Sequence, residues 1–244
     1  MTSAKSKKKG ARPGTRMRGA MEDAYATRGG RNARLYNGFS AKMHCDVVVS
    51  GALCFLHYLL AESDPAVVRV NYSPLVPGLD PKQQIGFHAE VVDRAEVLKL
   101  RTIRQASATP LPAQQEMIEL CMHRYRVMPN LRIGKYQTVD HEVLTEQQLI
   151  VGNELLLRNW LRVLKVCARA RYFPLAQAKR LLWARLDSQG SCTVADMLRM
   201  SSDQAPAGLI LAAAAKAAGN GECRSDLDTV ILGKNTRFYL RGRE

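Results

Sequence analysis

Four cations at helical spacing are candidate contacts for a negatively charged partner. Arg158, Arg162, Lys165 and Arg169 recur at intervals of four, three and four residues, and Arg171 follows them. This spacing places the four along one side of an α-helix. A stripe of positive charge attracts phosphate groups, which makes it a candidate contact for nucleic acid. A charged outer helix face is also often simply solvated, and this interpretation stays open.

The whole chain carries the same excess of positive charge. Its 244 residues include 36 Lys and Arg against 22 Asp and Glu, a formal net charge of +14. Such an excess raises the local concentration of polyanions and speeds encounter with them. Nucleic acid is the commonest partner of this kind, ahead of an acidic membrane surface or an acidic protein. Charge alone therefore selects a class of partner and not an activity.

The N-terminal segment is basic and poor in apolar residues. Within residues 1–40, only Glu22 and Asp23 oppose the many cations. A segment of this composition buries little surface and repels itself, so we expect a disordered basic arm. The arm either keeps the protein in solution or lies on phosphates and becomes ordered when it binds. Its candidate DNA contacts are Lys7, Lys8, Lys9, Arg12, Arg16 and Arg18.

The six cysteines do not have the spacing of metal ligands. Cys121 with His123, and His44 beside Cys45, are the nearest approaches to a ligand pair. A zinc site usually needs two short pairs that converge, so we expect no metal site and mostly buried thiols in a reducing cytosol. No apolar run is long enough to cross a bilayer, and no apolar segment follows the basic N-terminus as in a secretory signal. The sequence therefore predicts a cytoplasmic protein with no membrane partner.

The elements that position these residues fall into two groups. A helix is expected after Ser50, which can cap it, and it ends at Asp64-Pro65. Short β-type segments follow, two of them close enough to pair as a hairpin, and a helix and a strand complete a mixed α/β domain up to residue 143. The ranges expected for these segments are strands 67–72, 86–92 and 96–101, helix 113–125 and strand 136–139.

The second half of the sequence is expected to be mainly helical. Thr145-Glu146-Gln147-Gln148 has the form of a capping box, and the amphipathic helix 155–170 carries the cationic stripe. Shorter helices and a closing hairpin then follow in the order typical of a winged helix, at 175–186, 193–199, 206–218, 222–224 and 235–240. We therefore expect three regions, which are the basic arm (1–40), the α/β domain (41–143) and a helical, winged-helix-like domain (144–244).

The order of these segments resembles the TnsA family, the endonuclease subunit of heteromeric cut-and-paste transposases. Four stretches carry the resemblance: LHYLLAESDPAVVRVNYSP (56–74), GFHAEVVDRAEVLKLRT (86–102), YQTVDHEVLTEQQLIVGNELLLRNWLRVL (136–164) and GECRSDLDTVILGKNTRFYL (221–240). Each stretch is weak alone, and their order and spacing make the match. The resemblance implies a restriction-endonuclease-like mixed-sheet domain followed by a winged-helix domain.

The resemblance also implies a magnesium-dependent phosphodiesterase site. The family presents a Glu from the first helix, an Asp from one hairpin strand, a Glu or Gln from the other, and a Lys two residues later. Aligned on Asp64-Pro65, these positions hold Cys54, Ala89, Lys99 and Arg101. Magnesium requires oxygen ligands, which a thiol and two cations do not supply. We therefore expect no metal and no catalytic residue at these positions, with Mg²⁺ bound only if endonuclease activity is retained.

Two further interpretations of the hairpin stay open. Asp93, Glu96 and Lys99 could form a shifted acid-acid-lysine set, or Glu90 could turn inward with a one-residue bulge, although these can also be solvated hairpin charges. If the pocket is inactive, Lys99 and Arg101 would attract the phosphate that the metal once neutralised. Their replacement with Glu should then weaken DNA binding, unless both are simply surface cations.

The sequence thus predicts a DNA-binding, TnsA-like, non-catalytic subunit of a heteromeric transposition machinery. The resemblance implies a DDE-type transposase and a regulatory ATPase as protein partners, and a location at the nucleoid. One alternative is an active Mg-dependent endonuclease that cuts transposon ends through the shifted site. Another is an unrelated basic nucleic-acid-binding protein.

Overall fold

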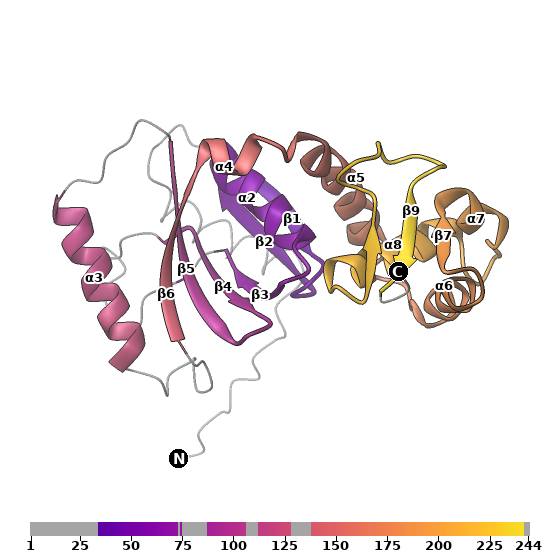
Figure 1. Ribbon diagram of the computed structural model, residues 1–244, viewed down its shortest axis with the longest axis horizontal. Coiled ribbons are helices and arrows are strands. Elements are labelled where there is room, and N and C mark those ends of the chain that lie inside the picture. The colour runs from indigo at the N-terminus through magenta and orange to yellow at the C-terminus, as the bar shows by residue number, and fades with distance from the viewer. Residues whose placement is uncertain (1–33, 73, 75–86, 106–111, 128–137, 242–244) are drawn as a thin grey trace, which may run out of the picture.

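A mixed four-stranded sheet organises the first half of the chain (Figure 1). The computed structural model describes residues 34–72, 74, 87–105, 112–127 and 138–241. The sheet order is β3 (Val67–Asn71), β4 (Ala89–Asp93), β5 (Val97–Arg104) and β6 (Thr138–Thr145). Neighbours are antiparallel except that β6 runs parallel to β5, and α3 (Pro112–Val127) lies in the crossover that a parallel pair requires. The expected α/β class is confirmed, and so is the expected hairpin of β4 and β5.

The two faces of this sheet pack against different helices. On one face, Leu98 and Leu100 form a small cluster with Ile118 and Met122 of α3. On the other face, Ala89 and the rest of the core pack beneath α2 (Ala52–Ser63). Successive side chains of a strand alternate between faces, so the odd-numbered Lys99 and Arg101 lie on the α2 side.

A hairpin that the sequence analysis did not predict precedes α2. β1 (Leu35–Ser40) pairs antiparallel with β2 (Cys45–Ser50), and Phe39 is only 5% exposed. The expected disordered arm is therefore wrong for residues 35–40, which form a strand that packs on the core through Phe39. Residues 1–33 lie outside the described residues. Gly38 is required by this packing, because a Cβ there would lie 2.8 Å from the ring of the buried Tyr58.

A buried glutamate near the end of α2 holds the turn between β1 and β2. Glu62 is 1% exposed. Its carboxylate accepts hydrogen bonds from the Ser40 hydroxyl (2.5 Å), the Ala41 and Lys42 amides (2.8 and 3.2 Å) and the Tyr72 hydroxyl (3.0 Å). Burial raises the pKa of Glu62, and these hydrogen bonds oppose the rise. The carboxylate is thus committed to the fold and is not a free metal ligand.

A lysine of the same turn connects three separate segments. The Lys42 ammonium donates hydrogen bonds to the carbonyl oxygens of Asp64 (2.8 Å), Val67 (2.5 Å) and Gly219 (2.6 Å). Gly219 belongs to the second half of the chain, 177 residues away. Burial lowers the pKa of Lys42 to about 8, and the charges of Glu62 and Asp64 partly offset this effect. The lysine therefore links the hairpin and the α2–β3 turn to the C-terminal helices.

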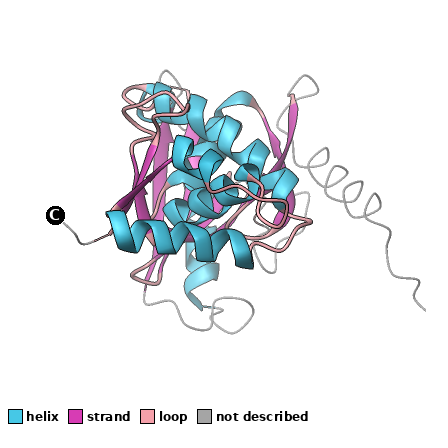
Figure 2. Cartoon of the chain, turned by 90° about the vertical axis from the view of Figure 1, so that its right-hand side faces the viewer, coloured by secondary structure: helices cyan, strands magenta, loops and turns pink. Residues whose placement is uncertain are grey.

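The second half is mainly helical, with a small sheet in the order β7-β9-β8. Its elements are α4 (Glu146–Ile150), α5 (Glu154–Ala170), α6 (Ala176–Gln189), β7 (Ser191–Thr193), α7 (Val194–Arg199), α8 (Ala207–Gly219), β8 (Cys223–Ser225) and β9 (Arg237–Leu240). The expected capping box at Thr145 and Gln148 is present, and Thr193 and Asp196 form a second one. Figure 2 shows that helices dominate this end of the molecule. No helix in the described segments is long and apolar enough to span a bilayer.

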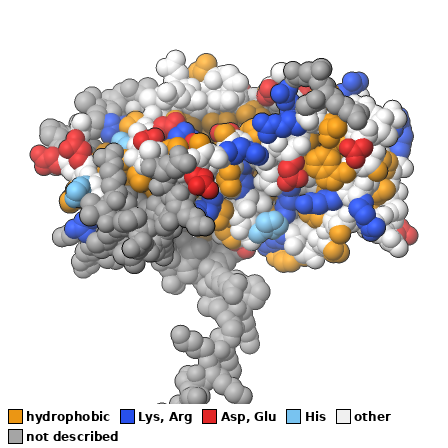
Figure 3. Space-filling model, turned by 60° about the horizontal axis from the view of Figure 1, so that its bottom comes forward, with side chains coloured by type: hydrophobic (Ala, Val, Ile, Leu, Met, Phe, Trp, Pro, Cys, Tyr) orange, Lys and Arg blue, Asp and Glu red, His pale blue; other side chains and the backbone are white. Residues whose placement is uncertain are grey.

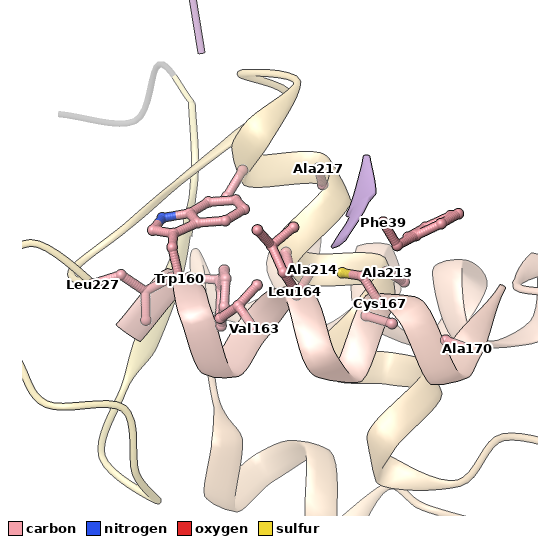
Figure 4. Close-up of a cluster of buried hydrophobic side chains, with 14 of the residues drawn as sticks. Phe39, Trp160, Val163, Leu164, Cys167, Ala170, Ala213, Ala214, Ala217 and Leu227 are labelled. Atoms are coloured by element: carbon pink, nitrogen blue, oxygen red, sulfur yellow. The ribbon is translucent and has the colours of Figure 1, made fainter. Parts of the chain in front are cut away.

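One hydrophobic core crosses the expected boundary between residues 143 and 144. Leu164 and Cys167 of α5 lie against the small side chains of α8, among them Ala213 and Ala214 (Figure 4). The same continuous cluster includes Tyr58 of α2. Alanines let two helices approach closely, and α5 thus packs against α8 and α2 at once. The two expected domains therefore share one core.

Candidate nucleic-acid interface

The predicted cationic stripe lies on the exposed side of α5. Arg158, Arg162, Lys165 and Arg169 are all exposed. The residues of the opposite side are buried, and they are Leu157, Trp160, Val163, Leu164, Cys167 and Ala170. With 3.6 residues per turn, the four cations fall within a narrow arc that extends about 16 Å along the helix axis. The amphipathic pattern of the sequence therefore positions the stripe, because burying the apolar side turns the cations to solvent.

These four cations are not paired with acids of the described part of the chain. The ion pairs found there involve Lys99, Arg101, Arg171, Arg185 and Arg199 instead. Cations in contact with solvent can exchange their counterions for phosphates, which is the main source of affinity for nucleic acid. Figure 3 shows one face of the molecule, on which Lys and Arg side chains lie among apolar ones. The arm cations at positions 7–9, 12, 16 and 18 lie outside the described residues.

The helix that would read bases in a helix-turn-helix pair is buried. α7 and α8 follow each other in the chain, and the second helix of such a pair normally enters the major groove. Ile210, Ala213 and Ala214 of α8 are at most 1% exposed, and Lys216 is the only charged residue of the helix. Placing α8 in a groove would require opening the core. An exposed nucleic-acid contact must therefore come from another element.

The loop between β8 and β9 is anchored to the buried side of α5. Asn159 is fully buried, and its amide nitrogen donates to the carbonyl oxygens of Leu227 and Val230 at 2.7 and 2.8 Å. Its side-chain oxygen accepts from the backbone amide of Leu232 at 2.9 Å. A buried amide satisfied by three partners holds a loop in one position. The closing hairpin is therefore a fixed part of the core, with Lys234 exposed at its end.

Arg101, the residue that the sequence alignment places at the lysine of the TnsA pattern, has two polar partners. Its Nε donates to Glu142 at 2.7 Å, and one terminal nitrogen lies 3.2 Å from Nε2 of His57. The parallel register of β5 and β6 places Glu142 directly beside Arg101. Burial, then the charge of Arg101 and His88, lowers the pKa of His57 to about 3. The imidazole is thus neutral at pH 7, and Glu142 balances the charge of the guanidinium.

Lys99 forms an ion pair with Asp93 at 3.4 Å. The Asp93 carboxylate also accepts hydrogen bonds from the backbone amides of Ala95 (2.9 Å) and Val97 (3.1 Å), within the β4–β5 turn. Partial burial raises the pKa of Asp93, but the amides and Lys99 outweigh it and lower the pKa overall. Glu96 is exposed in the same turn, with a left-handed φ of 58°. The structure thus brings Asp93 and Lys99 together in a turn that uses the acid structurally.

The other aligned positions are occupied as follows. Ala89 is fully buried and lies opposite Arg101 in the β4–β5 register. Glu90 pairs in register with Leu100 and so lies on the opposite face of the sheet; the only register shift of β3 and β4 is elsewhere, at residues 67–69. Cys54 is half-buried in α2, and burial raises the pKa of its thiol to about 11. The inward bulge considered for Glu90 is therefore not present.

These residues do not fit a magnesium site. Mg²⁺ takes oxygen ligands in near-octahedral geometry. The aligned positions instead offer a protonated thiol, a methyl group and two cations that already have acidic partners. Within the described residues, no three His, Cys, Asp or Glu side chains are grouped as metal ligands would be.

His57 and Glu142 are the residues of this region that the sequence analysis missed. Glu142 is near in sequence to the expected strand 136–139, but its contact with Arg101 depends on a parallel register that only the folded sheet defines. For His57, the available signal was its place one helical turn after Cys54. Both residues act on Arg101, which suggests that they position its side chain.

A cleft of about 570 Å³ lies beside Arg101, between the sheet and the C-terminal half. His57, Trp160 and Leu156 contribute to its wall, as do Arg224 and Arg241. Acidic residues also line it, so the wall does not present a single sign of charge. This mixed lining does not by itself select one class of ligand.

Comparison with known proteins adds no relative to this picture. No protein-family model matches the chain, and no curated protein or solved structure is significantly similar to it. The resemblance to the TnsA family therefore depends on the four sequence stretches given above.

Proposed function

We propose that this chain is a non-cleaving, DNA-binding protein that holds the phosphate backbone of duplex DNA on the exposed cationic side of α5. The observation that carries the proposal is the alignment of Arg158, Arg162, Lys165 and Arg169 in one solvent-exposed arc without acidic partners in the described residues. The excess charge of the whole chain favours the same class of partner. Contacts of this kind carry no base specificity, so binding should depend weakly on sequence.

The sequence resemblance extends this proposal to a biological setting. We propose a TnsA-like subunit of a transposition machinery, with a restriction-endonuclease-like first half, a winged-helix-like second half and a location at the nucleoid. The mixed sheet and the order of helices and strands after residue 175 are compatible with this assignment. The DDE-type transposase and the regulatory ATPase are the partners that the resemblance suggests.

A non-cleaving role agrees better with the hairpin than an active nuclease does. In the shifted site, Asp93 would have to leave both its backbone amides and Lys99 before it could coordinate a metal. Lys99 and Arg101 would likewise have to exchange their carboxylate partners for a phosphate. We therefore assign DNA binding to α5 in preference to these two cations.

The test compares two pairs of exposed cations by fluorescence anisotropy with a labelled duplex over a range of salt. Arg162→Gln with Lys165→Gln removes two charges from the stripe. Lys234→Gln with Arg237→Gln removes two charges from the closing hairpin, which a winged helix could use instead. The slope of log K against log salt is negative, and each lost phosphate contact lowers its magnitude by about 0.9. We expect the magnitude to fall by about 1.8 for the stripe pair and to stay unchanged for the hairpin pair.

Three outcomes would contradict the proposal. If the hairpin pair alone lowers the magnitude of the slope, the DNA contact lies on β8–β9 and not on α5. If the unaltered protein shows no salt-dependent affinity for duplex DNA, the excess charge serves another purpose. Mg²⁺-dependent nicking that is lost in Asp93→Asn would restore the active-nuclease alternative.

A further inference from the structure

Two consecutive aromatic side chains stand in solvent at the C-terminal end of α5. Tyr172 is 75% exposed and Phe173 is 58% exposed. They follow Arg169, the last cation of the stripe, by three and four residues. Exposed apolar patches rimmed by charged residues mark contacts with other molecules when they are large. These two rings beside a cationic surface are therefore a candidate contact for a partner that has both flat apolar faces and negative charge.

The ring of Tyr172 is held in place before any partner binds. The guanidinium of Arg171 lies over the Tyr172 ring at 4.6 Å and over the ring of the buried Phe39 at 5.4 Å. Arg171 also forms an ion pair with Asp46 and donates a hydrogen bond to the Tyr172 hydroxyl. The Arg171 guanidinium thus connects the Tyr172 ring to Phe39 of the core, while most of the surface of Tyr172 remains exposed to solvent. A ring fixed in this way loses little conformational freedom when a second flat group stacks on it.

The backbone under the pair is also ordered. The Phe173 amide donates to the carbonyl oxygen of Ala170 at 3.0 Å, which continues the turn at the end of α5. α6 begins only three residues later, at Ala176. The two rings therefore project from a short, anchored connection between two helices.

Further cations lie on the Phe39 side of this corner, where the His44 ring is 6.3 Å from the Phe39 ring. Lys216 of α8 lies 3.0 Å from Nε2 of His44, in the turn between β1 and β2. Burial, then Lys216 and Lys179, lowers the pKa of His44, so both ammonium groups act on the same small region. Asp46 is the nearby acid, and Arg171 is its partner. The corner therefore combines flat apolar rings with a positive potential.

We propose that Tyr172 and Phe173 form a stacking platform for the unpaired bases of single-stranded DNA, with the phosphates of that strand on Arg169 and Lys179. The inference rests on the proposed DNA binding by α5 and adds a substrate class to it. Stacked base pairs hide their faces inside a duplex, whereas a single strand can present them to aromatic side chains. Each nucleotide of an unpaired strand supplies both a flat face and a negative charge, the two chemistries that this corner can bind.

The experiment measures the affinity of the full chain for an oligothymidine of about 16 nucleotides and for a duplex of the same length. Tyr172→Ala combined with Phe173→Ala removes the platform, and Ile231→Ala is the control, because this residue is 54% exposed on the closing hairpin. We expect the double variant to lose about tenfold or more in affinity for the single strand. Its affinity for the duplex should stay within about twofold, and the control should change neither.

A variant with a fluorescent side chain at the platform gives an independent readout. Tyr172→Trp keeps a flat ring at the platform, so it should retain affinity, and its exposed indole should be quenched when oligothymidine binds. Of the two native tryptophans, Trp160 is 2% exposed, and Trp183 of α6 is partly buried, so the unaltered protein titrated in parallel gives the background signal to subtract. Quenching that follows the binding curve supports stacking. An indole that remains unquenched at saturation would contradict it.

The outcomes separate this inference from the function on which it rests. Duplex binding that depends on the α5 cations, together with single-strand binding indifferent to the double alanine variant, overturns the platform alone. An equal loss for both DNA forms also overturns it, because a duplex cannot stack on the rings. If neither DNA form binds at low salt, both proposals fail, and the aromatic corner is then better explained as a contact for a protein partner.

Discussion

Replacing Lys42 with methionine should destabilise the whole protein, although the residue lies in a turn near the start of the described chain. Its ammonium donates hydrogen bonds to three carbonyl oxygens, of Asp64, Val67 and Gly219. Methionine has a similar length and apolar stem but donates no hydrogen bond. The substitution therefore removes the three bonds and keeps most of the packing.

The magnitude follows from two opposing effects. A hydrogen bond to a charged group contributes about 1.5–3 kcal/mol, so three such bonds contribute about 5–9 kcal/mol. Against this stands the net penalty on the charged form of the buried amine, seen in the fall of the Lys42 pKa from 10.5 to about 8. At about 1.4 kcal/mol per unit, that cost is about 3 kcal/mol. The net loss expected for Lys42→Met is thus about 2–6 kcal/mol, a large part of the stability of an ordinary domain.

Urea denaturation followed by circular dichroism measures this loss as a fall in the free energy of unfolding at pH 7. Lys234→Met is the matched control, because Lys234 is exposed and its replacement should change stability by no more than about 0.5 kcal/mol. A loss below about 1 kcal/mol for Lys42→Met would refute the reasoning. It would mean that water replaces the ammonium at the three carbonyls and that the link between the halves is not energetically important.

Two further predictions concern His57 and Lys99. The pKa of His57 falls from 6.5 to about 3 on folding, so between these pH values the unfolded chain binds a proton that the folded chain does not. The free energy of unfolding should therefore be constant with respect to His57 above pH 6.5 and fall by several kcal/mol as the pH decreases towards 3. In His57→Gln this loss should be clearly smaller, as urea titrations at pH 7 and 5 would reveal, and an unchanged loss would show that other groups cause it. Lys99→Gln should leave duplex affinity within about twofold, because Asp93 already balances the ammonium; a tenfold fall in anisotropy titrations would instead support phosphate binding at Lys99.

Local patterns in the sequence predicted most of the elements. The capping box at Thr145 and Gln148 forms as expected, because a cap depends only on residues three apart. The amphipathic helix was expected at 155–170 and is α5, Glu154–Ala170. The hairpin of β4 and β5 also follows from a short turn between two β-type segments. In each case the signal and the structure lie within a few residues of each other.

Contacts between distant segments were not predictable in this way. β1 contains Asn37 and Gly38, which weaken the strand signal, and only pairing with β2 and packing on Tyr58 reveal why they are there. The strand expected at 136–139 is β6, Thr138–Thr145, whose length is set by its parallel partner β5. The boundary expected at residue 143 reflects a change from strands to helices, which does not require separate cores.

The same limitation affects the candidate site. Spacing alone placed the four cations of α5 on one side, and the structure agrees because the opposite side is apolar. Spacing did not reveal that Lys99 and Arg101 have carboxylate partners, since Asp93 reaches Lys99 across a turn and Glu142 reaches Arg101 from a neighbouring strand. A cation in a sequence is thus a candidate contact, and its charge is available only if no partner folds next to it.

Because of the position of α5, one straight duplex could not lie on the cationic stripe and at the aligned metal positions at the same time. Trp160 and Leu156 of this helix line the cleft beside Arg101, and both lie on the side of α5 opposite Arg158 and Arg162. A straight duplex lying on the stripe would therefore face away from the aligned metal positions. α5 is also part of the core that joins both halves, so it cannot rotate to bring the two together. On the proposed function, the stripe would therefore bind DNA independently of the aligned metal positions.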